Sequence, residues 1–133
     1  MSTLLQQGVA AAQVRGESKR FSVTIGAVAM NAGDLFILTS GLAVAVADGG
    51  KIDGVLARDG AVSETNVPAD ILVDGDVWDF KCSSLTADMG SRVATASAST
   101  LDGGVAPHIG IIIEGAITTA EVQVRVLIQR NAA

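Results

Sequence analysis

Apolar residues in this 133-residue chain recur mostly at every second position, in short stretches separated by glycine, aspartate and serine. Phe21, Val23 and Ile25 alternate with polar residues, and residues 122–128 repeat this period over a longer stretch. A period of two places successive side chains on opposite faces of a strand, so these stretches are predicted to be β-strands. The predicted strands cover residues 21–25, 34–39, 42–46, 52–57, 71–73, 77–82, 93–95, 108–114 and 121–130.

Turn signals separate the predicted strands. Asp74-Gly75 stands between two apolar stretches, and this pair is typical of a type I′ hairpin turn, which needs positive φ at both central residues. Helical spacing occurs only in residues 4–14 and 85–89. We therefore expect a mainly β fold, a small β-barrel or sandwich with many tight turns.

One predicted strand, at residues 77–82, carries most of the aromatic content. Trp78, Phe80 and Cys82 share one face, which we expect to be buried. Asp79 and Lys81 lie on the other face. We therefore expect Asp79 to point outward beside Lys81.

A faint internal repeat runs through the chain. Gly33 and Gly90 are 57 residues apart, and Gly54 and Gly110, each followed by apolar residues, are 56 apart. In each half a further apolar stretch follows. The spacing predicts two related β-units that close onto one core.

The composition indicates limited burial within a single copy. Aromatic residues make up 3% of the chain, tyrosine is absent, and 15 residues are glycine. Alanine and glycine bury little area each, so an isolated monomer is expected to be modestly stabilised. Such a chain is suited to gaining further burial by assembly.

Several classes of protein are disfavoured by charge and hydropathy. The net charge of −5 argues against a nucleic-acid binder, whose affinity comes largely from neutralising phosphates. No apolar stretch approaches the roughly 20 residues that span a bilayer, and the first residues lack the pattern of a secretory signal. The single cysteine, Cys82, permits no internal disulfide.

The charge is unevenly distributed. Residues 1–20 have a net charge of +2, and the remainder has −7. We interpret residues 1–20 as an N-terminal arm that docks on a neighbouring subunit or another partner, and residues 21–133 as a β-barrel domain. Edge-strand addition is one plausible mode of docking. The residues expected to make these contacts are Leu4, Leu5, Val9, Arg15, Lys19 and Arg20.

No set of residues indicates catalysis, a metal or a cofactor. His108 is the single histidine, and it is expected to be a surface or subunit-contact residue. Cys82 is expected to be a small core residue. The acidic cluster around Asp74 and Asp76 is what a turn requires, and the calcium-loop pattern is missing. Phosphate-loop and dinucleotide motifs are also missing.

Three stretches of the first half carry a family resemblance. They are AGDLF at residues 32–36, GLAVA at 41–45 and KIDGVLA at 51–57, with a looser copy in GIIIE at 110–114 and in residues 122–128. Over roughly residues 21–130 the chain resembles the head decoration proteins, also called capsid cement proteins, of tailed bacteriophages. The later Ala-Gly-Asp motif departs from the pattern, since residues 87–90 read ADMG.

The resemblance implies a β-tulip or β-barrel fold and a structural, non-enzymatic role. Such proteins are usually trimers on the outer surface of the phage head, where they clamp neighbouring major capsid subunits against internal DNA pressure. The arm would then contact the major capsid protein. No cofactor, nucleic acid or membrane is implied, and the chain would be made in the bacterial cytoplasm and end in the virion.

Two other functions stay open. The first is a non-enzymatic β binding module of a virion, associated with the receptor or the tail. The second is a small trimeric hydrolase, which the absence of tyrosine makes a poor match to the trimeric nucleotide pyrophosphatases.

Overall fold

The computed structural model describes residues 11–16, 20–46, 51–82, 86–97, 100–104, 108–118 and 122–129. Every regular element in these ranges is a strand, and the strands form two small closed barrels. The predicted mainly β, barrel-forming fold is therefore confirmed, with two barrels where we expected one. The strands are β1 (Ala11–Arg15), β2 (Arg20–Ile25), β3 (Leu35–Thr39), β4 (Leu42–Ala45), β5 (Gly54–Leu56), β6 (Val67–Ile71), β7 (Val77–Cys82), β8 (Arg92–Ser97), β9 (Thr100–Asp102), β10 (Gly110–Glu114) and β11 (Val122–Ile128).

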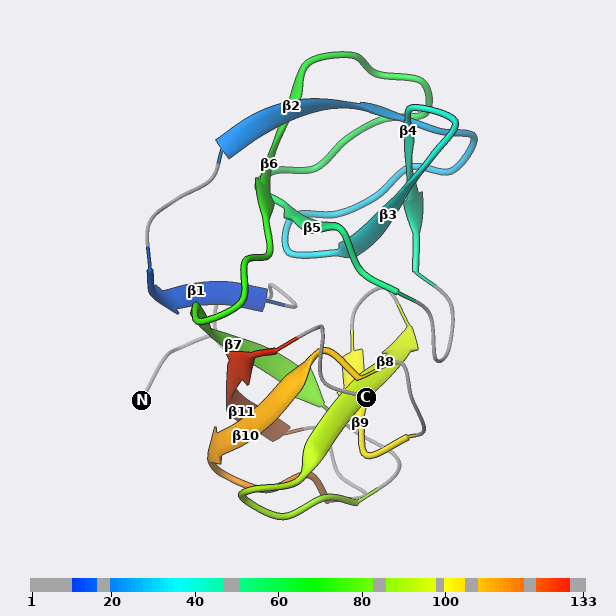
Figure 1. Ribbon diagram of the computed structural model, residues 1–133. Helices are drawn as coiled ribbons and strands as arrows, with labels where there is room; N and C mark the ends of the chain where they lie inside the picture. Colours follow the sequence, from blue (N-terminus) through cyan, green and yellow to red (C-terminus); the bar gives the residue numbers. More distant parts are fainter. Residues whose placement is uncertain are drawn as a thin grey trace.

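The first barrel contains β2 to β6 and occupies the upper part of Figure 1. Its strands follow the order β2-β4-β3-β5-β6, and β6 pairs with β2 to close the ring. The β2–β4 pair is parallel, and the other four pairs are antiparallel.

The second barrel contains β7 to β11 and lies below the first in Figure 1. Its strands follow the order β7-β11-β10-β8-β9, and a parallel bridge between Cys82 and Leu101 closes the ring. Strand β1 adds to this barrel by pairing antiparallel with residues Val77 to Phe80 of β7.

The two barrels have the same topology. If β2 to β6 are matched in sequence order with β7 to β11, each strand pair of one barrel has a counterpart with the same direction in the other. The isolated bridges Met30–Gly60 and Ala87–Ile117 also correspond, since Ala87 lies 57 positions after Met30 and Ile117 lies 57 positions after Gly60. The internal repeat predicted from glycine spacing is therefore present in the structure.

The repeated glycines hold equivalent turns. Gly33 and Gly90 have φ of 84° and 91°, a region that side chains rarely adopt. The Gly33 N–H donates to the Leu56 carbonyl at 2.7 Å, and the Gly90 N–H donates to the Ile112 carbonyl at 2.8 Å. Each turn thereby links the residues just before one strand, β3 or β8, to the neighbouring strand of its barrel, β5 or β10.

Gly54 and Gly110 also occupy equivalent positions. A Cβ atom at Gly54 would lie 2.6 Å from the carbonyl oxygen of Asp70, and one at Gly110 would collide with the carbonyl oxygen of Leu127. Each glycine therefore permits a neighbouring strand to approach closely.

The core differs from the single one expected. One cluster fills the first barrel, and a larger cluster joins the second barrel to residues of the first that face it. The first cluster contains Val23, Ile25, Met30, Phe36, Ala43, Leu56, Val67 and Ala69. The larger cluster includes Leu35, Ile52, Val55 and Leu72 from the first barrel, and Trp78, Phe80, Val124 and Val126 from the second.

Neither stretch with helical spacing forms a helix in its described part. For residues 4–14 the sequence leaves both a helix and an extended arm open; Ala11 to Arg15 form a strand, and residues 4–10 lie outside the described ranges. The expected helical turn at residues 85–89 is also absent from its described part, where Ala87 forms a β-bridge. In both stretches backbone pairing with residues distant in the sequence outweighs weak helical spacing.

The turn at Asp74-Gly75 does not form the expected hairpin. Asp76 N–H donates to the Val73 carbonyl at 3.1 Å, but only Gly75 has positive φ, which is typical of a type II turn. The flanking strands β6 and β7 do not pair with each other. The turn therefore carries the chain from the first barrel to the second.

Candidate functional site

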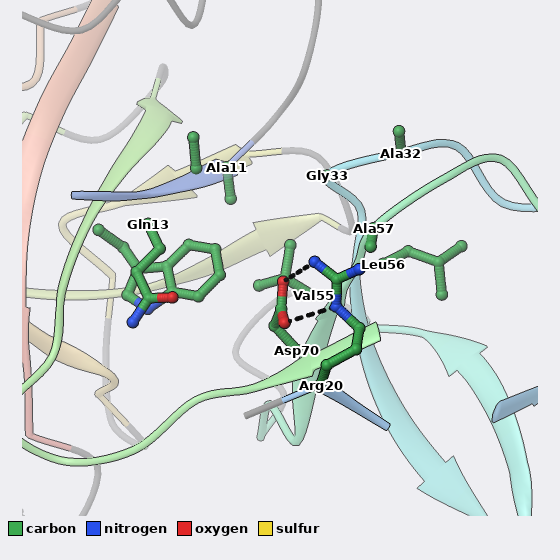
Figure 2. A pocket seen from close by; sticks show the side chains of 11 residues that line it. Ala11, Gln13, Arg20, Ala32, Gly33, Val55, Leu56, Ala57 and Asp70 are labelled. Atoms are coloured by element: carbon green, nitrogen blue, oxygen red, sulfur yellow. Dashed lines mark hydrogen bonds and ion pairs between the residues drawn. The ribbon is translucent and has the colours of Figure 1, made fainter. Parts of the chain in front are cut away.

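A pocket of about 240 Å³ lies between the two barrels, next to β1. Figure 2 shows Ala11 and Gln13 on one side of it and Ala57 and Gly33 on another. Small side chains and glycine thus form much of its wall. The full lining is Ala11, Ala12, Gln13, Arg20, Ala32, Gly33, Val55, Leu56, Ala57, Asp70 and Trp78.

An ion pair supplies the charge in this pocket. The Arg20 guanidinium donates to Asp70 at 2.9 and 3.3 Å, as Figure 2 shows. These hydrogen bonds raise the pKa of Arg20. The side chain of Arg20 is 55% exposed, so solvent screens the pair and limits its contribution to stability. Both charges are already satisfied, and the pocket has no concentrated charge of one sign.

The structure describes only two of the six residues expected to contact a partner, Arg15 and Arg20. Leu4, Leu5, Val9 and Lys19 lie outside the described residues. Arg15 is exposed at the end of β1. Residues 11–15 of the expected arm therefore extend the chain's own second barrel.

Asp79 is placed opposite to our expectation. It has no exposed surface, and Arg125 on β11 donates to its carboxylate at 3.0 and 3.3 Å. Gln123 adds a bond of 3.4 Å, and Glu114 lies 3.7 Å from the guanidinium. The sequence does not reveal this pair, because the two residues are 46 positions apart.

Cys82 and His108 do not form a nucleophile and base. Burial raises the pKa of the Cys82 thiol to about 12, and the thiol donates to the Phe80 carbonyl at 3.7 Å. A thiol with this pKa supplies almost no thiolate at neutral pH. His108 Nε2 lies 3.0 Å from the carbonyl oxygen of Gly104. The expectation that Cys82 is a small core residue is confirmed.

The acidic residues are dispersed. Asp70 binds Arg20, Asp79 binds Arg125, and Asp76 accepts a bond of 3.4 Å from Gln13. Within the described ranges, no group of three or more histidine, cysteine or acidic residues could hold a metal ion.

The Ala32-Gly33-Asp34 motif has a structural role. The Asp34 carboxylate accepts from the Asn31 N–H at 2.9 Å, and the Asp59 carboxylate accepts from the Ala32 N–H at 2.8 Å. Partial burial raises the pKa of Asp34, and the nearby charge of Asp59 acts in the same direction. The motif therefore fixes the turn before β3, and the turn at Gly90 repeats it without the carboxylate.

The first barrel exposes several large apolar side chains. Val28 and Val62 are 69% and 55% exposed, in turns that are joined by a bond from the Ser63 N–H to the Gly26 carbonyl. Leu42 and Val44 point outward on β4, while Ala43 between them is fully buried. These side chains are available for burial against a partner.

Comparison of the chain with family models, curated proteins and solved structures found no match in any of the three. In the described residues, no helix is long and apolar enough to cross a membrane.

Proposed function

We propose that the chain is a capsid decoration protein of a tailed bacteriophage. It binds the outer surface of the head as a homotrimer and stabilises contacts between major capsid subunits against internal DNA pressure. It needs no cofactor, and it contacts neither nucleic acid nor membrane. It is made in the bacterial cytoplasm and ends on the outside of the virion.

The observation that carries this proposal is the structural role of the residues behind the resemblance. The Ala32-Gly33-Asp34 motif forms the turn that fastens the first barrel, and Gly54 permits the close strand contact that follows. Both features recur in the second barrel at Gly90 and Gly110. The resemblance therefore involves residues that build the repeated fold, which supports a shared architecture.

The surface agrees with a structural role. The exposed apolar side chains of the first barrel, among them Val28, Val44 and Val62, are suited to burial against a larger assembly. The described ion pairs are dispersed over the molecule, as for Asp79 with Arg125 and Asp70 with Arg20. A hydrolase requires an activated nucleophile, and Cys82 is a poor one because of its raised pKa.

One observation favours the second candidate, a binding module of the virion. The pocket between the barrels, with a volume of about 240 Å³, is a concave site lined by residues of both barrels. Its mixed charge and small lining residues give no preference for a ligand class. We therefore rank this candidate below decoration.

The test is to delete the part of the arm that precedes β1. Removal of residues 1–10 leaves β1 on the second barrel, whereas removal of residues 1–20 would also remove a strand of the sheet. We expect the shortened chain to keep its β circular dichroism and melting cooperativity but to lose co-sedimentation with expanded heads of its phage.

Two controls complete the experiment. A chain with Leu4, Leu5 and Val9 changed to serine keeps the length and charge of the arm, and should also fail to bind. A chain with Lys51 changed to alanine, outside the arm and exposed, should bind as the wild type. Normal occupancy of heads by the shortened chain would overturn the role of the arm, and failure of the full-length chain to bind any head would overturn decoration.

A further inference from the structure

The two barrels differ at one edge. In the second barrel, residues Val77 to Phe80 of β7 lie between β11 on one side and β1 on the other. The counterpart residues Arg20 to Val23 of β2 pair with β6, and β4 begins to pair only at Thr24. Within the part of the chain that the structure describes, the position equivalent to β1 is therefore unfilled on β2.

The backbone groups at this edge point outward. Ser22 lies opposite Pro68 of β6, and proline has no N–H to donate. The Pro68 carbonyl accepts from Ala57 at 2.9 Å, on the side of β5. Ser22 and Pro68 therefore form a non-hydrogen-bonded pair, so the N–H and carbonyl of Ser22 point away from β6.

The same alternation applies two residues earlier, at Arg20. Residues 20 and 22 of a strand direct their backbone groups to the same side, because the direction alternates along the chain. Arg20 and Ser22 thus present two donors and two acceptors at the edge. No described residue bonds to them there, in contrast to Val77 and Asp79 beside β1.

We propose that this edge pairs with the same edge of a second copy, β2 against β2, in antiparallel orientation about a two-fold axis. Arg20 of each copy then forms a hydrogen-bonded pair with Ser22 of the other, which gives four hydrogen bonds. Phe21 lies opposite its own counterpart at the axis, in a non-hydrogen-bonded pair with about 4.5 Å between the Cα atoms.

Side-chain chemistry favours this register. Arg20 lies opposite the neutral Ser22 of the second copy and keeps its own ion pair with Asp70, so no like charges meet. Phe21 is only half-buried in one copy, although it packs against Phe36 with 6.2 Å between the ring centroids. Pairing at the axis covers its remaining surface with a second aromatic ring.

This contact does not depend on the proposed decoration function. A two-fold contact is distinct from the three-fold contacts of a trimer, so it joins two single chains or two trimers. Joining two single chains doubles the mass, and joining trimers gives a species of at least twice the mass of one trimer.

The experiment compares Ser22→Pro with Ser22→Thr in the full chain by sedimentation equilibrium. Proline removes the N–H of Ser22 in both copies, and this N–H has no described partner within one chain, so the barrel should remain folded. Loss of two hydrogen bonds should weaken association about thirtyfold. The threonine variant keeps the N–H and should associate as the wild type.

Three results would overturn the proposal. The first is equal mass for the proline variant and the wild type at concentrations where the wild type associates. The second is a wild type that does not associate at all. The third is loss of association after removal of residues 1–10, which would assign the edge to the arm of the second copy.

Hydrogen exchange of the wild type provides a test that does not depend on the folding of a variant. The amide hydrogen of Ser22 should exchange more slowly as protein concentration rises, whereas that of Val23, which points toward β6, should not change. A Ser22 exchange rate that does not depend on concentration would contradict the pairing.

Discussion

Asp79 and Arg125 face each other across β7 and β11, and the guanidinium donates two hydrogen bonds to a carboxylate that has no exposed surface. The two partners are unequally buried, since the side chain of Arg125 is 22% exposed. Arg125 can therefore turn to water or to Glu114, while Asp79 has no such alternative.

This asymmetry predicts unequal costs of removing the two partners. Arg125→Ala leaves a buried carboxylate with Gln123 alone and should cost about 3 kcal/mol of unfolding free energy. Asp79→Ala leaves a partly exposed cation and should cost about 1–2 kcal/mol. Urea unfolding at neutral pH measures both, and a larger loss for Asp79→Ala would contradict the assignment.

The close strand contacts predict that glycine is required at two equivalent positions. Gly54→Ala and Gly110→Ala place a methyl group against a backbone carbonyl and should each cost about 2–3 kcal/mol. Gly26→Ala is the matched control, because its Cβ would lie 3.4 Å from the nearest atom and φ is not positive. This control should cost less than about 1 kcal/mol in the same urea titration. Similar costs at all three positions would show that the contact is not tight.

The raised pKa of Asp34 predicts that the stability of the fold depends on pH. Burial raises the pKa of Asp34, so the folded state binds a proton more readily than the unfolded state. Stability from this group is therefore present at low pH and is lost as pH rises through the window just above the ordinary aspartate pKa. Asp34→Asn keeps an oxygen that can accept from Asn31 and removes the titration.

The measurement for Asp34 is the difference in unfolding free energy between wild type and Asp34→Asn from pH 3.5 to pH 7. The unfolding free energy of the wild type should rise relative to that of the variant as pH falls, because only the wild type takes up the proton at residue 34. A constant difference, or one that changes in the opposite direction, would rule out the raised pKa.

The environment of Cys82 predicts that its thiol is unreactive in the folded chain. The pKa of about 12 and complete burial both suppress the thiolate at pH 8. A disulfide reagent should therefore modify the folded protein only as fast as the fold opens to expose the thiol. In denaturing urea the modification should be immediate. Stoichiometric labelling of the folded chain within seconds would mean that the thiol is accessible.

The sequence predicted those parts of the fold that depend on local pattern. The alternation at Val122 to Ile128 correctly predicted a strand with Val124, Val126 and Ile128 inside. The spacing of Gly33 and Gly90 correctly indicated a repeat. Such signals arise from backbone geometry and from one buried face, and both leave a period in the chain.

The features that the sequence did not predict depend on distant partners. Asp79 is buried because Arg125 arrives from another strand, and Ala11 to Arg15 are extended because β7 offers an edge. On β4 the small Ala43 is buried and the larger Leu42 is exposed, opposite to the usual order of size. The partner contacts expected of Leu4, Leu5, Val9, Arg15, Lys19 and Arg20 stay predictions. The exposed valines in turns were not predicted.

Strand β1 makes the two halves of the molecule unequal. The two barrels have the same topology, but only the second has an additional strand on its first strand, β7. The edge of β7 is paired with β1, whereas the equivalent edge of β2 has no partner among the described residues. Pairing of two β2 edges about a two-fold axis uses the same edge of both copies, so it leaves no β2 edge for a third copy.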